Sequence, residues 1–117
     1  MKLATWNINS VRLRVDLVLD FLKTSNADIL CLQETKTQDH AFPAAAFADA
    51  GWPHQAIRGE KSYNGVAILS RQPLAGSGHI DWAGRGDCRH IWAQTESGIK
   101  IHNFYVPAGG DVPEPDQ

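Results

Sequence analysis

The chain has little of what marks several large protein classes. Its 117 residues include only two cysteines, Cys31 and Cys88, which is too few for a disulfide framework and is typical of unrelated thiols in a reducing compartment. No apolar run approaches the roughly 20 residues of a membrane-spanning helix, and no charged segment followed by a short apolar stretch opens the chain. We therefore expect a cytoplasmic protein with no membrane partner.

The chain also lacks an excess of charge of either sign. Eleven Lys and Arg against 13 Asp and Glu give a formal net charge of -2 and a pI near 6.2, so binding to nucleic acid would need a local basic patch. No glycine-rich loop precedes a helix, which disfavours a nucleotide-binding fold. No histidine pair has zinc-binding spacing, and we expect all five to be structural or exposed: His40, His54, His79, His90 and His102.

The first third of the chain has the pattern of a β-α-β unit. Strand-like apolar runs occupy residues 2–6 and 29–32, and the second run lacks alternation, as in a strand buried on both faces. Between them the pattern predicts a helix with Ser10 as its N-cap and Asn26 just past its end. The two strands should be parallel, with their carboxyl ends side by side. The helix would bury the apolar residues that recur at helical spacing: Leu13, Leu17, Val18, Phe21 and Leu22.

The rest of the chain changes to short apolar runs separated by glycine and proline. Pro43 is suited to start a second helix that runs to Ala50. Antiparallel strands are predicted at 54–57, 66–70, 90–95 and 99–106, with a tight turn at Ser97 and Gly98. We therefore expect an α/β domain over residues 1–106, built on a mixed, mainly antiparallel sheet with helices on one face. Residues 107–117 should form a flexible tail or a truncated connection.

Polar side chains follow both parallel strands of the predicted unit. Asn7 and Asn9 come after the first strand, and Glu34 and Lys36 after the second. A carboxylate held at such a strand end is a ligand that Mg²⁺ uses, and an asparagine can offer its carbonyl to a metal or a donor to a phosphate oxygen. The alternatives are a solvated Glu34 that caps a loop and an Asn9 that only caps the helix. The pattern predicts a metal or phosphate site at one rim of the sheet.

Four segments resemble, in order and spacing, the motifs of the exonuclease III family. They are Thr-Trp-Asn-Ile-Asn-Ser at 5–10, Leu-Gln-Glu-Thr-Lys at 32–36, Tyr-Asn-Gly-Val-Ala-Ile-Leu-Ser at 63–70 and Asn-Phe-Tyr-Val-Pro at 103–107. This family of abasic-site endonucleases and 3′-to-5′ exonucleases belongs to the endonuclease/exonuclease/phosphatase superfamily. Its fold is a four-layered α/β sandwich of two similar halves, with the active site between them. The resemblance implies that this chain is the N-terminal half.

The resemblance also implies roles for individual residues. Glu34 would bind the catalytic Mg²⁺, or Mn²⁺ in its place, and Asn7 would help hold the metal. Tyr105 and Asn7 would be catalytic, with the tyrosine hydroxyl donating to the scissile phosphate; a tyrosine that only anchors the strand end is the alternative. The partner would be double-stranded DNA with abasic sites or 3′ ends, whose phosphates would contact loop residues that are otherwise solvated charges or polar groups: Asn9, Arg12, Lys36, Arg58, Lys61, Tyr63 and Arg89.

Two motifs of the family are missing from these 117 residues. A Gly-Asp-x-Asn motif would supply groups around the attacking water, and a later Ser-Asp-His motif would supply a histidine; neither sequence occurs. We therefore expect a Mg²⁺-dependent nuclease half that is inactive in isolation. Its sheet should have an uncovered apolar face through which copies associate. The alternatives are a non-catalytic binding or interaction module and another phosphoesterase of the superfamily.

Overall fold

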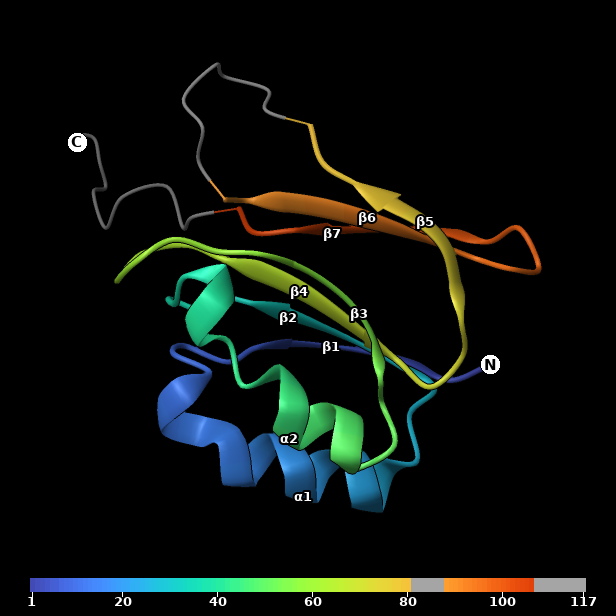
Figure 1. The fold of residues 1–117 in the computed structure, drawn as a ribbon, viewed down its shortest axis with the longest axis horizontal. Helices are drawn as coiled ribbons and strands as arrows, with labels where there is room; N and C mark the ends of the chain where they lie inside the picture. The colour runs from blue at the N-terminus through green and yellow to red at the C-terminus, as the bar shows by residue number, and fades with distance from the viewer. Residues whose placement is uncertain (81–87, 107–117) are drawn as a thin grey trace, which may run out of the picture.

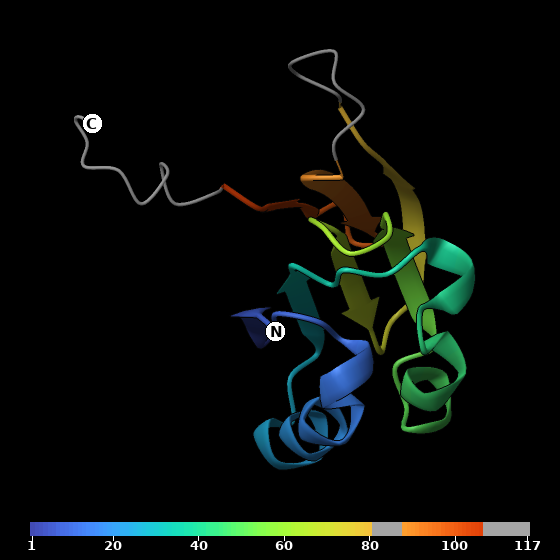
Figure 2. The ribbon, with the colours of Figure 1, turned by 90° about the vertical axis from the view of Figure 1, so that its left-hand side faces the viewer.

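The computed structural model describes residues 1–80 and 88–106, which form three layers (Figure 1). Two helices lie under a four-stranded sheet, and a three-stranded sheet lies on the other face of it; Figure 2 shows the same stacking from the side. The elements in chain order are β1 (Leu3–Asn7), η1 (Arg12–Arg14), α1 (Val15–Ser25), β2 (Ile29–Gln33), η2 (Asp39–Ala41), α2 (Ala44–Asp49), β3 (His54–Arg58), β4 (Val66–Ser70), β5 (Leu74–Gly78), β6 (His90–Thr95) and β7 (Lys100–Phe104).

The first sheet has the mixed character that the sequence predicts. Its strand order is β1-β2-β4-β3; β1 and β2 are parallel, and the other neighbours are antiparallel. Asn7 and Gln33 face each other at the carboxyl ends of β1 and β2. Strand β2 is buried along almost its whole length, as its unbroken apolar run indicates. The α/β class and the helices on one face of this sheet are confirmed.

Helix α1 ends as predicted but does not begin as predicted. Asn26 adopts a left-handed conformation, and its N–H donates to the Leu22 carbonyl at 3.3 Å. Ser10 is not the N-cap, because a 3₁₀ turn over η1 precedes the helix and Arg14 occupies the cap position without a side-chain hydrogen bond. This turn places Leu13 on the surface, where it is 80% exposed, and Val11 becomes a core residue instead.

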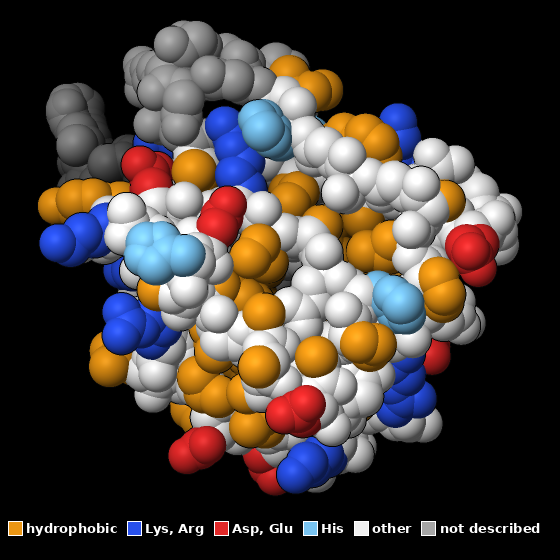
Figure 3. Space-filling model, in the orientation of Figure 1, with side chains coloured by type: hydrophobic (Ala, Val, Ile, Leu, Met, Phe, Trp, Pro, Cys, Tyr) orange, Lys and Arg blue, Asp and Glu red, His pale blue; other side chains and the backbone are white. Residues whose placement is uncertain are grey.

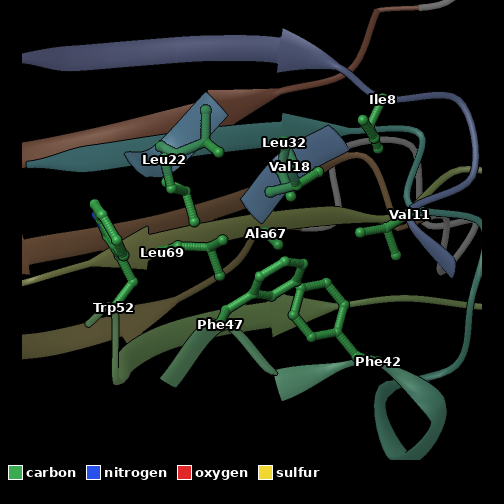
Figure 4. Packing of buried hydrophobic residues seen from close by; sticks show 11 residues of the cluster. Ile8, Val11, Val18, Leu22, Leu32, Phe42, Phe47, Trp52, Ala67 and Leu69 are labelled. Atoms are coloured by element: carbon green, nitrogen blue, oxygen red, sulfur yellow. The ribbon is translucent and has the colours of Figure 1, made fainter. Parts of the chain in front are cut away.

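The larger core lies between the helices and the first sheet (Figure 4). Leu22 of α1 and Phe47 of α2 are fully buried, and Phe42 packs on Phe47 with ring centroids 5.7 Å apart. Trp52, just after α2, donates its indole N–H to the Ala27 carbonyl at 2.9 Å. Burial of such side chains contributes about 1.5–3 kcal/mol each, so this layer supplies much of the stability that holds β1 and β2 in place.

A second sheet, ordered β5-β6-β7, covers most of the other face of the first sheet. Ile68 of β4 is buried against this layer together with Ile91 and Ile101. The expectation of an uncovered sheet face is therefore wrong for most of the first sheet, and self-association stays a prediction. What stays open is a groove of about 450 Å³ beside β1 and β7, lined by Leu3, Ala4, Thr5, Cys31, Gln33, Ile101, His102, Asn103 and Phe104.

Strand β5 is a strand that the sequence does not predict. Its five residues, Leu-Ala-Gly-Ser-Gly, contain two glycines and little apolar alternation. Gly78 has a packing reason, because a Cβ at this position would lie 2.9 Å from the indole nitrogen of Trp92. The tight turn at Ser97 and Gly98 is confirmed by the bonds between Thr95 and Ile99 that close the hairpin. The predicted tail at 107–117 lies outside the described residues.

Both cysteines are buried, and neither forms a disulfide bond. Burial raises the pKa of the Cys31 thiol to about 11, so this thiol stays protonated and unreactive at neutral pH. The absence of a disulfide between Cys31 and Cys88 agrees with the prediction of two unrelated thiols. In the part of the chain that the structure describes, no helix combines the length and the apolar character that crossing a membrane requires.

His90 and His102 form a hydrogen-bonded pair on neighbouring strands. His90 is 2% exposed; its Nδ1 accepts from the backbone N–H of Ile80 at 2.9 Å, and its Nε2 lies 3.0 Å from His102 Nδ1. Because Nδ1 already accepts a hydrogen bond, a proton on that atom would break the bond to Ile80. Burial lowers the pKa of His90, and the charges of His102, Arg58 and His79 lower it further.

The lowered pKa of His90 predicts a loss of stability in mild acid. Below the ordinary histidine pKa of 6.5, the side chain of His90 is protonated in the unfolded chain but still neutral in the folded chain. The free energy of unfolding therefore falls as the pH drops below 6.5. We expect a neutral His90→Gln variant to lose less of its melting temperature between pH 7.5 and 5.5 than the unmodified chain. Equal losses in the two proteins, measured by circular dichroism, would contradict the assignment.

Candidate active site

The parallel pairing of β1 and β2 brings four of the predicted residues together. Asn7 Nδ2 donates to Glu34 Oε1 at 2.8 Å, and Lys36 Nζ lies 3.5 Å from Glu34 Oε2. The same ammonium donates to Asn9 Oδ1 at 2.6 Å. The Glu34 side chain is about one-fifth exposed, so the carboxylate is held by two partners and still reaches solvent. The predicted convergence of Asn7, Asn9 and Glu34 at one rim is confirmed.

The loops at this rim have unusual backbone conformations. Asn9, Ser10, Glu34 and Lys36 all have positive φ angles, between 48° and 81°, a region that non-glycine residues seldom occupy. Backbone bonds tie the two loops together, since the Ser10 N–H donates to the Glu34 carbonyl at 2.8 Å. Such conformations cost of order 1–3 kcal/mol each and concentrate at functional sites.

The loop that contains Asn64 and Gly65 supports the loop that follows β2. The Lys36 N–H donates to the Asn64 carbonyl at 2.9 Å, and the Thr35 N–H donates to the Gly65 carbonyl at 3.2 Å. Gly65 has a φ of +97°, and a Cβ there would lie 2.0 Å from Thr35 Oγ1. The sequence shows Asn64 and Gly65 only as part of a motif; the structure shows that they support the loop that carries Glu34.

Tyr105 lies at the same end of the molecule. β1, β2 and β7 all run toward this end (Figure 1), and Tyr105 follows directly after β7. Its N–H donates to the Arg89 carbonyl at 2.8 Å, and its half-buried side chain packs against the core between the two sheets, on the same face of β7 as Asn103. Arg89 is thereby the strand neighbour of Tyr105, next to β6.

Some of the basic residues lie around an open hollow near the rim, whereas Arg58 contacts the second sheet. Arg12 and Lys36 line an open hollow of about 570 Å³, together with Ser10, Leu13 and Ser62. Tyr63, next to Ser62, is 71% exposed. Several Lys and Arg side chains lie at the left of the view in Figure 3, the end where β1, β2 and β7 stop, although others are spread over the rest of this face. Lys61 is exposed nearby. Arg58 instead donates to the His90 carbonyl at 3.3 Å.

The possible metal ligands at this rim fit a hard divalent cation. They are oxygens, from the Glu34 carboxylate and the Asn7 amide, and Mg²⁺ is held by one or two carboxylates together with water and substrate phosphate. Within residues 1–80 and 88–106 there is no cluster of three or more His, Cys, Asp or Glu side chains that would enclose a metal. The ligands among the described residues would thus hold a cation from one side only.

Sequence reasoning missed the polar contacts behind this rim. Gln33 Nε2 donates to Thr5 Oγ1 and to Asn103 Oδ1, each at 2.8 Å, which links β1, β2 and β7. Asn103 is 3% exposed. The sequence feature that could have indicated these contacts is the place of Asn103 in the Asn-Phe-Tyr-Val-Pro segment, where a polar residue occupies an inward position of a strand.

The structure is that of an α/β protein in which one carboxylate, two asparagines and a lysine meet at the ends of parallel strands. The chain belongs to the Endonuclease/Exonuclease/phosphatase family, whose model matches residues 4–117. It resembles the exonuclease III branch: it is 39% identical over 74 residues to an exodeoxyribonuclease from Bacillus subtilis.

Two solved structures have the same fold over 97% of this chain. A 3′ phosphatase from Neisseria, NExo, bound to product DNA hairpin, superposes with a TM-score of 0.86 at 38% identity, and an AP endonuclease from Archaeoglobus fulgidus with 0.83 at 39% identity. The chain covers 45% and 44% of these two chains, and its match covers 29% of the Bacillus protein. It corresponds to the N-terminal part of such proteins.

The contact between Gly65 and Thr35 makes a testable prediction. We expect Gly65→Ala to lower the free energy of unfolding by about 3 kcal/mol or more, because the new methyl group meets a buried side chain and the φ angle is strained. Gly98→Ala is the matched control, since Gly98 has a φ of +98° with nothing within 4 Å; we expect a loss of about 1 kcal/mol there. Similar losses in urea titrations of the two variants would refute the bracing role of Gly65.

Proposed function

We propose that this chain carries the metal-binding and phosphate-binding part of a Mg²⁺-dependent nuclease that hydrolyses phosphodiester bonds in DNA at abasic sites or 3′ ends. The observation that carries the proposal is the contact of Glu34 with both Asn7 and Lys36 at the ends of two parallel strands, with Tyr105 at the same end. The relatives support it, because they include an exodeoxyribonuclease, an AP endonuclease and a 3′ phosphatase bound to DNA.

Each residue at the rim has a distinct role in this proposal. A Mg²⁺ held at this rim would polarise a phosphate oxygen and stabilise the charge that develops on it. Glu34 would be its carboxylate ligand, and Asn7 holds that carboxylate in orientation through the 2.8 Å hydrogen bond. Lys36 joins Glu34 to Asn9. The Tyr105 hydroxyl would donate a hydrogen bond to a phosphate oxygen, which would hold the scissile group in position.

DNA binding in this proposal depends on local charge, since the chain as a whole is slightly acidic. Arg12 and Lys36 share one hollow, and Tyr63 is exposed in the loop beside it. Arg89 lies next to Tyr105. Such contacts to phosphates set the position of the duplex without reading its sequence.

Hydrolysis also needs a group that activates water, and the rim supplies none among the residues that the structure describes. The sequence contains neither Gly-Asp-x-Asn nor Ser-Asp-His. We therefore propose that the 117-residue chain binds metal and DNA but does not hydrolyse DNA at an appreciable rate. Incubating it with an abasic duplex and Mg²⁺ tests this directly, and cleavage that Glu34→Gln abolishes would disprove it.

The metal site is tested by exchanging one carboxylate for an amide. We expect Glu34→Gln to weaken Mn²⁺ binding about tenfold or more, because a charged ligand is replaced by a neutral one of the same shape. Water proton relaxation at rising Mn²⁺ concentration measures this affinity. Glu96→Gln, in the exposed turn between β6 and β7, is the control and should bind normally. The same Mn²⁺ affinity in both variants would contradict the assignment of Glu34 as a metal ligand.

The phosphate contacts predict a change in salt dependence. We expect Arg12→Ala to weaken binding to an abasic duplex and to reduce the slope of log affinity against log salt by about 1, because one phosphate contact is lost. Lys23→Ala, on the exposed surface of α1, is the control. Fluorescence anisotropy at several salt concentrations would show equal slopes for both variants if Arg12 lay outside the DNA interface.

A non-catalytic binding module is the second candidate, favoured by the missing water-activating motifs. Another phosphoesterase of the superfamily, acting on a lipid or inositol phosphate, would share the metal site. Competition separates this phosphoesterase from the DNA nuclease: an inositol phosphate that displaces Mn²⁺-dependent DNA binding more strongly than a 3′-phosphate oligonucleotide would favour the phosphoesterase.

A further inference from the structure

A buried amide links the two sheets at the end that carries the rim. Asn103 of β7 is 3% exposed. Its Nδ2 donates to the carbonyls of Leu32 and Ala67, each at 2.9 Å, and its Oδ1 accepts from Gln33 Nε2 at 2.8 Å. Both amide protons and the oxygen are therefore engaged, which fixes the orientation of the side chain.

The two carbonyl acceptors belong to one pair of residues in the first sheet. Leu32 of β2 and Ala67 of β4 face each other in the antiparallel ladder. Asn103 therefore inserts its amide from the second sheet across the β2–β4 pair, where its two hydrogen bonds define one position of β7. The apolar contacts around it, such as those of Ile101 with the first sheet, are non-directional and tolerate sliding.

Gln33 extends this connection to β1. Its Nε2 also lies 2.8 Å from Thr5 Oγ1 of β1. Each member of this connection stands one or two positions before a residue of the rim: Gln33 precedes Glu34, Thr5 precedes Asn7 by two residues, and Asn103 precedes Tyr105 by two. The short separations leave little freedom between the connection and the rim.

We propose that Asn103 is a positioning residue that sets the distance between Tyr105 and the Glu34–Asn7 pair. Without its amide, β7 keeps its apolar contacts with the first sheet but loses the directional bonds that hold it in register with β2. Tyr105 then moves relative to the metal ligands. The assignment of those ligands rests on the proposed function; the coupling between β7 and β2 does not.

The test is nuclear magnetic resonance of the ¹⁵N-labelled chain. Asn103→Leu keeps the approximate volume and removes the polar contacts, and Gln33→Met removes the Asn103–Gln33 and Gln33–Thr5 bonds in case the first variant does not fold. Lys100→Ala is the matched control on the same strand, because Lys100 lies over the Trp92 ring, within the second sheet. Two measurements are made on each protein.

The first measurement is amide hydrogen exchange. The Tyr105 amide, which bonds Arg89, and the Ile8 amide, which bonds Gln33, should exchange about tenfold faster in Asn103→Leu, because lost hydrogen bonds lower the cost of local opening. The Thr95 amide, at the far end of the same hairpin, should keep its rate. Faster exchange at all three amides equally would mean only a general loss of stability and would overturn the proposal.

The second measurement adds Mn²⁺, whose broadening of an amide signal falls with the sixth power of the distance. In the unmodified chain and in Lys100→Ala we expect broadening at Asn7 and Tyr105. In Asn103→Leu the broadening of Tyr105 should decrease relative to that of Asn7, and an unchanged ratio would refute the positioning role. If Mn²⁺ broadens neither signal in the unmodified chain, the proposed metal site fails, and amide exchange alone decides the role of Asn103.

Discussion

The parallel pairing of β1 with β2 is the constraint on which the rest of this structure depends. It places Asn7 opposite Gln33, so that the loops following both strands start side by side and Asn7 reaches Glu34 at 2.8 Å. A parallel pair requires a crossover, and α1 supplies it while burying Val18 and Leu22 against the sheet. The local chemistry of the rim therefore follows from the same packing that stabilises the first layer.

The rim is held by backbone more than by side chains. Glu34 and Lys36 both have positive φ angles, and the strain is supported by hydrogen bonds from neighbouring loops, including those to the carbonyls of Asn64 and Gly65. A carboxylate held in this way loses little conformational entropy when it binds a cation. The same arrangement explains why a glycine stands at position 65, where no side chain fits.

The two sheets contribute different parts of the proposed site. The first sheet carries the acidic and amide ligands, and the second carries Arg89, just before β6, and Tyr105, just after β7. Apolar packing holds the sheets together, whereas the Asn103 amide supplies directional bonds between β7 and the β2–β4 pair. A site split between two layers depends on their register, and a buried amide with several bonds is a suitable device for fixing it.

The sequence by itself determined the local features: the helix end at Asn26, six strands, and the polar residues that follow β1 and β2. These depend on short-range patterns of apolar residues and caps. Strand β5 and the role of Gly65 could not be predicted, because each depends on contacts with distant segments, Trp92 in one case and Thr35 in the other. The 3₁₀ turn that exposes Leu13 is local, but the pattern of apolar residues does not indicate it. The covering of the first sheet and the bonds of Asn103 to Leu32 and Ala67 were decided only by tertiary structure, since they join residues up to 71 positions apart.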